Sequence, residues 1–298
     1  MLEQDSILPL LPKSALEYFN DIDDSNKLYL KATSIRTCLE NIVDTIFIHI
    51  INEDNNIDTK KWEKQDLYEK IKSLDSFFSK NRQKQLHQIR KVGNKGTHPK
   101  LHKMLKENDI SISLNDLSKL SEWTILSYFQ KYGFKINTWL PTIFSTLQPI
   151  YRIRILEPYF YSLKFENEEL IKHLEKIQYN TDNFIFTRIE DVTDKEKELD
   201  EIILIIDKLS MAYLKNKEYE KSINFIKKLF NKNIINERFK NEMIEKLELL
   251  WKSFNHLPIS QNIEETKNRF TEIMKVVKKE EESLFITIFT AIISQGEI

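Results

Sequence analysis

Glycine, proline and cysteine are scarce in this sequence, which holds four, seven and one of them among 298 residues. Tight turns of types II, I′ and II′ depend on glycine, so the composition argues against an all-β sandwich with many such turns. The single cysteine, Cys38, allows neither an intrachain disulfide nor a zinc site with two or more thiolate ligands. Lys, Glu, Leu and Ile dominate long stretches without a helix breaker. We therefore expect an all-α fold.

Long hydrophobic runs are also lacking. The longest, IILII at residues 202–206 and LFITIFTAIIS at 284–294, are too short to span a bilayer. The N-terminal MLEQDSILPLLPKS has acidic residues and no basic region before an apolar core, unlike a secretory signal. We expect a cytoplasmic protein with no membrane association.

Apolar residues recur at helical spacing through much of the chain. This pattern predicts helices over residues 25–51, 60–74, 79–99 and 113–133. Two short segments, YRIRIL at residues 151–156 and NFIFTRIEDV at 183–192, are interpreted as strands. The rest of the C-terminal part is again helical in pattern.

Residues 134–165 differ from their surroundings because they contain three prolines and many aromatic residues. We predict an N-terminal helical bundle over residues 1–135, a connecting segment over 136–165, and a C-terminal α-helical domain over 166–298. Within the last, IIDKLSMAYLKNKEYEKSINFIKKLF resembles one tetratricopeptide repeat, with plain helix packing as the alternative. Its packing positions are Leu209, Ser210, Tyr213, Tyr219, Ser222, Ile226 and Leu229.

Positive charge is concentrated in one segment, although the net charge of the chain is only −1. Residues 79–106 contain nine basic residues and no Asp or Glu. The nine are Lys80, Arg82, Lys84, Arg90, Lys91, Lys95, Lys100, Lys103 and Lys106. Such a segment predicts a local anion-facing surface, unless acidic residues elsewhere in the fold supply its counter-charges.

Two of the four glycines lie in QIRKVGNKGTHPK at residues 88–100. On one helix, Arg90, Asn94 and His98 follow one another by a turn and project to the same side. Gly93 and Gly96 remove bulk beside them, which suits close approach of either another helix or a phosphate backbone. We expect the three polar side chains at the edge of the buried stripe.

An earlier helix carries a second polar pair at the edge of its apolar stripe. Arg36 lies beside that stripe, and Glu40 follows one turn later as a potential ion-pair partner. If this helix packs against the one that contains Arg90, both residues face Arg90, Asn94 and His98.

The segments SIRTCLENI and QIRKVGNKGTH, some fifty residues apart, resemble the HEPN superfamily. The likeness is stronger to an uncharacterised HEPN-like domain that is associated with restriction and defence proteins, and it covers roughly residues 10–135. It implies an up-and-down helical bundle, usually a homodimer, with Arg90, Asn94 and His98 as catalytic residues and Arg36 and Glu40 as supporting ones.

The resemblance also implies a metal-independent endoribonuclease with no cofactor, whose products carry 2′,3′-cyclic phosphates. His98 suits proton transfer, Arg90 suits the phosphate, and Asn94 suits orientation of either. His87 and His102 are weaker candidates for proton transfer, because lone surface histidines are usually inert. RNA would be held electrostatically by lysines. These are Lys84, Lys91, Lys95, Lys100 and Lys103. The biological setting implied is phage defence or a toxin-like system.

Two other functions fit the same residues. Gly93 occupies the place where the ribonuclease form has its Arg, so Arg90, Asn94, His98 and Glu40 could instead form a satisfied polar network in a non-catalytic, dimerising or nucleic-acid-binding module. The C-terminal helices could bind a protein partner, which would make the chain a sensor or adaptor.

Overall fold

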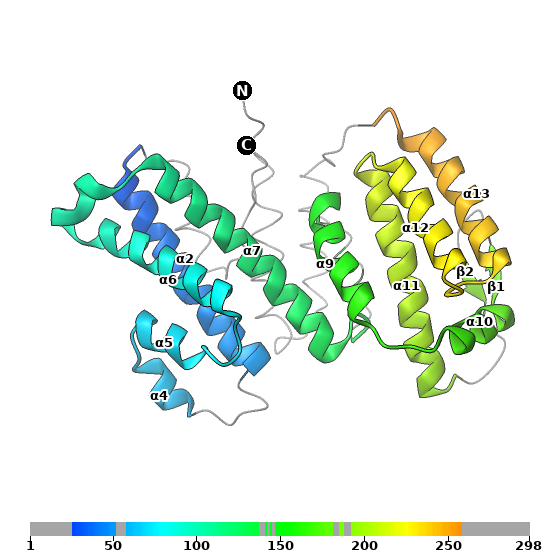
Figure 1. Ribbon diagram of the computed structural model, residues 1–298, viewed down its shortest axis with the longest axis horizontal. Helices are drawn as coiled ribbons and strands as arrows, with labels where there is room; N and C mark the ends of the chain where they lie inside the picture. The colour runs from blue at the N-terminus through cyan, green and yellow to red at the C-terminus, as the bar shows by residue number, and fades with distance from the viewer. Residues whose placement is uncertain are drawn as a thin grey trace, which may run out of the picture. The chain divides into compact units, whose positions relative to one another are not determined.

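The computed structural model describes residues 26–51, 58–136, 141, 144, 147–180, 185–187 and 192–257 (Figure 1). Helices account for most of these residues, so the predicted all-α class is confirmed. The chain divides into two compact units between Lys131 and Tyr132. The predicted end of the N-terminal bundle at residue 135 lies close to this division. The last part of the predicted C-terminal domain, after residue 257, lies outside the described residues.

The first unit is a helical bundle, as predicted. Its elements are α2 (Leu28–Ile46), a π-helical turn (Phe47–Ile51), α4 (Thr59–Glu63), α5 (Leu67–Ser73), α6 (Lys80–Thr97), a 3₁₀ helix (Pro99–Met104) and α7 (Glu107–Tyr132). The single helix predicted over residues 60–74 is two helices, because Asp66 starts a new one through a capping box with Glu69. The helix predicted from residue 113 begins earlier, at Glu107.

The core of this unit forms where α2 packs along α6, and the two helices run side by side (Figure 1). Nearly every apolar residue on the predicted stripe of α2 is buried. The buried residues of α6 are Leu86, Ile89, Val92, Gly93 and Gly96. Ser79 caps α6 by accepting a hydrogen bond from Arg82 N, and the helix ends before Pro99, as predicted.

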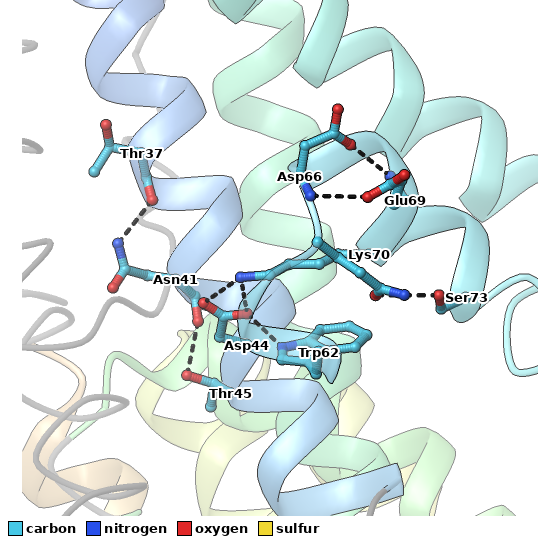
Figure 2. Close-up of polar contacts among 10 residues, drawn as sticks. Thr37, Asn41, Asp44, Thr45, Trp62, Asp66, Glu69, Lys70 and Ser73 are labelled. Carbon is cyan, nitrogen blue, oxygen red and sulfur yellow. Dashed lines mark hydrogen bonds and ion pairs between the residues drawn. The ribbon is translucent and has the colours of Figure 1, made fainter. Parts of the chain in front are cut away.

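A polar cluster fastens α4 and α5 to α2 (Figure 2). Asp44 Oδ1 accepts hydrogen bonds of 2.8 Å from both Trp62 Nε1 and Lys70 Nζ. Lys70 is buried, and its ammonium group also lies 3.1 Å from Asp44 Oδ2. The Trp62 ring stacks on Phe47 with 3.9 Å between the ring centroids. This cluster fixes the position of α5, which lies beside α6.

The second unit is also helical. Its elements are α9 (Pro149–Ser162), α10 (Asn167–Lys176), β1 (Gln178–Asn180), β2 (Ile185–Thr187), α11 (Asp194–Lys215), α12 (Tyr219–Asn231) and α13 (Glu237–Phe254). β1 and β2 pair antiparallel, with Tyr179 opposite Phe186. The strand predicted within residues 183–192 is therefore present as β2.

The strand predicted at residues 151–156 is wrong, because this segment lies inside α9. Its alternation of Ile and Arg is typical of a half-buried strand. In α9, however, consecutive residues are buried, including Tyr151, Arg152 and Ile153. A helix that is covered on most sides leaves no clear periodicity in its sequence.

α11 and α12 form the helical hairpin that was predicted from its packing residues. Ser222 Oγ donates a 2.8 Å hydrogen bond to the carbonyl of Ser210, and both residues are fully buried. Tyr219 is half-buried and stacks on Trp251 of α13. The hairpin is thus observed, and its assignment to a tetratricopeptide-like repeat stays a prediction.

None of the described helices is both long enough and apolar enough to cross a membrane.

Candidate functional site

Gly93 and Gly96 allow α6 to approach α2 closely. A Cβ atom at Gly93 would overlap Cβ of Arg36 and lie 3.2 Å from its Cα. At Gly96, it would lie 2.6 Å from the carbonyl oxygen of Tyr29 and 2.8 Å from the backbone nitrogen of Thr33. Real Cβ atoms do not tolerate such distances, so both positions require glycine. Of the two reasons that the sequence offered for these glycines, helix–helix contact is the one observed.

The polar residues beside the glycines lie along one edge of α6, next to Tyr68 of α5. The guanidinium carbon of Arg90 lies 5.0 Å from the centroid of the Tyr68 ring. His87, one turn before Arg90, has its ring centroid 5.5 Å from that of Tyr68. Asn94 follows Arg90 by one turn on the same edge. We call His87, Arg90 and Asn94 the polar edge of α6.

Each residue of the polar edge presents a buried polar atom that has no hydrogen-bond partner within the described residues. The atoms are His87 Nδ1, Arg90 Nε and Asn94 Oδ1. Asp75 Oδ1, from the turn before α6, is also buried and has no hydrogen-bond partner within the described residues. Buried polar atoms in folded proteins nearly always have a partner, so four on and beside α6 without one in the described part of the chain mark this edge as a candidate binding site. The satisfied polar network considered from the sequence is not formed by these side chains.

The surroundings of His87 favour its neutral form. Burial lowers its pKa below the ordinary 6.5, the positive charges of Arg90 and Lys91 lower it further, and Asp75 opposes them. A neutral imidazole can accept a proton, whereas an imidazolium cannot. The polar edge therefore combines a proton acceptor with a permanent cation.

The sequence led us to expect His98 on the same helix as Arg90 and Asn94. The structure places it just beyond the end of that helix. α6 ends at Thr97, and His98 is the residue after its end, with an extended backbone that points its side chain into solvent. The histidine that packs here is His102, whose Nε2 lies 2.8 Å from the carbonyl of Gly96 and whose ring stacks on Tyr29. His98 is thus an exposed group beyond one end of the polar edge.

The supporting residues occupy α2 where it meets α6. Arg36 is half-buried, and its side-chain stem covers Gly93, immediately before Asn94. Glu40 is half-buried one turn further along. The ion pair that their spacing suggested is not formed in the described part of the chain. Arg36 is therefore brought to the polar edge as expected, and its charge is not neutralised by Glu40.

Acidic residues of α7 neutralise part of the basic segment. Lys95 pairs with Asp109 at 3.4 Å. Burial lowers the pKa of Arg82, and the nearby Asp116 and Glu122 act in the opposite direction. The other four lysines predicted to bind nucleic acid are exposed and form no ion pair with any described residue. They are Lys84, Lys91, Lys100 and Lys103. The anion-facing surface is thus smaller than the sequence suggested.

A groove of about 390 Å³ borders this surface. It is lined by Asn81, Lys84, Gln85 and Gln88 of α6 and by Asp116 of α7. Gln85 Nε2 donates to Asp116 Oδ1 at 3.3 Å, which connects the two walls. All five lining residues are of polar types, and three of them carry amide groups, which can both donate and accept hydrogen bonds.

The described residues contain no cluster of three or more His, Cys, Asp or Glu side chains suited to a metal ion. Cys38 is buried, and burial raises the pKa of its thiol to about 12. A thiol of that pKa is protonated at neutral pH and is a poor nucleophile or ligand.

Sequence reasoning missed Tyr68 and Asp75 and ranked His87 low. Tyr68 lies on another helix, and its place beside Arg90 depends on how the Asp44–Lys70 contact docks α5. The one signal within α6 is the spacing of His87 and Arg90, which are three residues apart and so lie on one face of a helix.

The first unit is thus a helical bundle with a polar, partly basic edge on one helix. A family model described as Domain of unknown function (DUF4145) matches residues 20–129. The first unit is similar to that family over most of its length, and the description names no activity. No curated protein and no solved structure matches the chain.

Proposed function

We propose that the first unit is a HEPN-like module that binds RNA at the polar edge of α6 and cleaves it without a metal ion. One observation carries the proposal. His87, Arg90 and Asn94 hold buried polar atoms that have no partner among the described residues, and a ligand or a second copy of the chain would supply those partners. Exposed Lys84 and Lys91 on the same helix favour a polyanion as that ligand.

The reaction needs no group beyond RNA and protein side chains. The ribose 2′-OH attacks the adjacent phosphorus and loses its proton to a base, while the bond from phosphorus to the 5′-oxygen breaks and that oxygen takes a proton from an acid. The products are a 2′,3′-cyclic phosphate and a 5′-hydroxyl. Arg90 would neutralise the charge that develops on the phosphoryl oxygens, and Asn94 would orient the phosphate.

Two histidines compete for the proton transfers. His98 is exposed and has no partner in the described residues, so it can reach a bound strand from the end of α6. His87 is nearer to Arg90, and its lowered pKa keeps it ready to accept a proton. In a homodimer, the resemblance implies that residues of two copies meet at this edge and share the acid and base roles.

Cleavage of total RNA by the purified protein in EDTA tests the proposal. The variants are Arg90→Ala, Asn94→Ala, His98→Ala and His87→Ala. His256→Ala and Arg238→Ala serve as matched controls, because both residues lie in the second unit and are exposed. We expect 2′,3′-cyclic phosphate ends with the wild type and the controls, and a loss of about 10²-fold or more in rate with Arg90→Ala. The histidine whose loss abolishes cleavage supplies the essential proton transfer.

A second function, RNA binding without cleavage, is favoured by the position of His98 outside the helix of Arg90 and Asn94. It predicts that Arg90→Ala weakens RNA binding while no variant changes the RNA ends. Cleavage that is unchanged in Arg90→Ala and in both histidine variants would exclude this site as the active one. Loss of dimer formation, measured by sedimentation, in Arg90→Ala and Asn94→Ala without any effect on RNA would instead assign the polar edge to the subunit interface. A phage-defence or toxin-like setting remains part of the proposal through the family resemblance.

A further inference from the structure

A concave pocket lies in the second unit, between the end of α9, the start of α10 and the end of α12. Its volume is about 210 Å³. Phe160 and Leu229 are buried at its floor, and Leu163, Phe165 and Ile234 are half-buried around it. A cavity of about 150 Å³ holds one benzene molecule, so this pocket has room for a single large apolar side chain.

The rim of the pocket is polar and positively charged. It is made of Tyr161, Asn167, Lys228 and Lys232, all of which are exposed. Lys228 Nζ lies 3.3 Å from the hydroxyl of Tyr161 and 5.4 Å from the centroid of its ring. No acidic residue is among the described residues that line the pocket.

In the described part of the chain, the two rim lysines lack the carboxylate partners that several other lysines of the second unit have. Lys221 pairs with Glu218, and Lys240 pairs with Glu237. Neither Lys228 nor Lys232 has a carboxylate partner among the described residues. Because they follow one another by one turn at the end of α12, their ammonium groups are available on the same side of that helix. A ligand with negative charge next to an apolar group is therefore complementary to this pocket.

Asn167 gives the rim a group that can recognise a peptide backbone. Its Nδ2 donates to the carbonyl of Lys232 at 3.3 Å, which leaves Oδ1 to accept a hydrogen bond from a ligand N–H. A nucleobase fits less well, because Lys228 already lies over one face of the Tyr161 ring on which the base would stack.

We propose that this pocket binds a protein partner through a peptide segment in which one large apolar side chain is flanked by acidic residues. The apolar side chain enters between Phe165 and Leu229, the acidic residues face Lys228 and Lys232, and the backbone meets Asn167. The pocket belongs to the second unit and the polar edge of α6 to the first, so the function of the pocket does not depend on RNA cleavage.

Peptide selection on the full chain tests this proposal. Random phage-displayed peptides are selected on the wild type and depleted on the double variant Lys228→Glu/Lys232→Glu, whose exposed positions leave the fold intact. We expect enriched peptides to share an aromatic or large aliphatic residue between acidic residues. Failure to enrich any peptide over the double variant, or enrichment of peptides without acidic residues, would overturn the proposal.

Fluorescence polarisation then measures each contribution. The probe is a dye-labelled peptide with one Phe between Asp and Glu residues, and its relatives carry Ser in place of Phe or Lys in place of the acids. We expect both relatives, and the double lysine variant, to bind about tenfold more weakly or worse. Lys227→Glu, a neighbouring exposed position outside the pocket lining, should bind the probe nearly as the wild type does. Oligouridylate that binds more tightly than the acidic probe and with the same lysine dependence would reassign the pocket to RNA.

Discussion

Gly93 of α6 lies directly against the side-chain stem of Arg36 of α2. The contact brings α2 against the residue before Asn94, and it holds the side-chain stem of Arg36 beside the polar edge. The geometry of the candidate site therefore depends on the absence of one methyl group.

Gly93→Ala and Gly96→Ala should both destabilise the first unit. Alanine favours a helix over glycine by about 1 kcal/mol, so if α2 were further away each change would stabilise the protein. The close approach to α2 reverses the sign, and we expect a net loss of about 1–3 kcal/mol. Gly96→Ala should cost more, since its neighbours include backbone atoms that cannot move aside. Urea unfolding measures the change, with Lys91→Ala as an exposed control on α6; a rise in stability at either glycine would contradict the packing.

Asp44→Asn should destabilise the docking of α5. Lys70 is buried and would keep its charge with no carboxylate opposite it. Asp44 is partly exposed, so we expect a loss of about 1–3 kcal/mol rather than the full cost of a buried pair. The double variant Asp44→Asn/Lys70→Met should recover part of that loss. A double variant that is as unstable as the sum of both single variants would show that the two groups do not interact.

The pKa of His87 should lie below 6.5, as measured by NMR titration of its ring. Arg90→Gln should raise it and Asp75→Asn should lower it further, because the first removes a repelling cation and the second an attracting anion. Shifts of the same sign in both variants would contradict the observed arrangement.

The His87 imidazole also makes the free energy of unfolding depend on pH. Its folded-state pKa is lower than its unfolded one, so the unfolded chain binds the proton first as the pH falls below 6.5. The lowered pKa of His87 therefore reduces the free energy of unfolding as the pH falls below about 6.5. It has no effect on stability at higher pH. His87→Gln should flatten this part of the stability curve.

Arg152→Met should stabilise the protein. Arg152 of α9 is 4% exposed, and its Nε and Nη2 atoms have no hydrogen-bond partner in the described part of the chain. Burial lowers its pKa from 12.5 to about 10, so the charged form that is present at pH 7 is disfavoured in the folded state. Met keeps the length of the stem without the charge. We expect a gain of about 1–3 kcal/mol in urea unfolding at pH 7.

Arg238→Met is the control for that change, because Arg238 is exposed in a surface pair with Glu242 and should contribute less than about 1 kcal/mol. A loss of stability in Arg152→Met would mean that the guanidinium has a partner when the protein is folded in solution.

If RNA binds at α6, Lys84 and Lys91 should contribute more to the affinity than Lys95 does. Lys84→Ala and Lys91→Ala remove exposed charges that form no ion pair with described residues. Each should therefore reduce the slope of log affinity against log salt concentration by roughly 0.7 for every phosphate that the lysine neutralised. Lys95→Ala should have a smaller effect, because Asp109 already neutralises that charge. Affinities measured by filter binding across a range of salt concentrations, with Lys227→Ala as the control, check the order.

Much of the fold could be predicted because it depends on local signals. The stripe of α2, the Ser79 cap and the Pro99 end of α6, and the end of α7 at Gly133 follow from hydrophobic periodicity and from the backbone preferences of single residues. The helix break before Asp66 was missed, although its capping box is also local. Residues 151–156 were misassigned because α9 is buried on most sides, which removes the helical period from its sequence.

The sequence by itself determined the all-α class, the concentration of basic residues at 79–106, and the presence of Arg90 and Asn94 on one edge of a helix, since each depends on composition or on spacing along one element. Only the tertiary structure decided that the glycines meet α2, that Tyr68 of α5 lies beside Arg90, and that α7 neutralises Lys95. These relationships join residues from different helices. They depend on how the helices pack, and no spacing within a single segment encodes that packing.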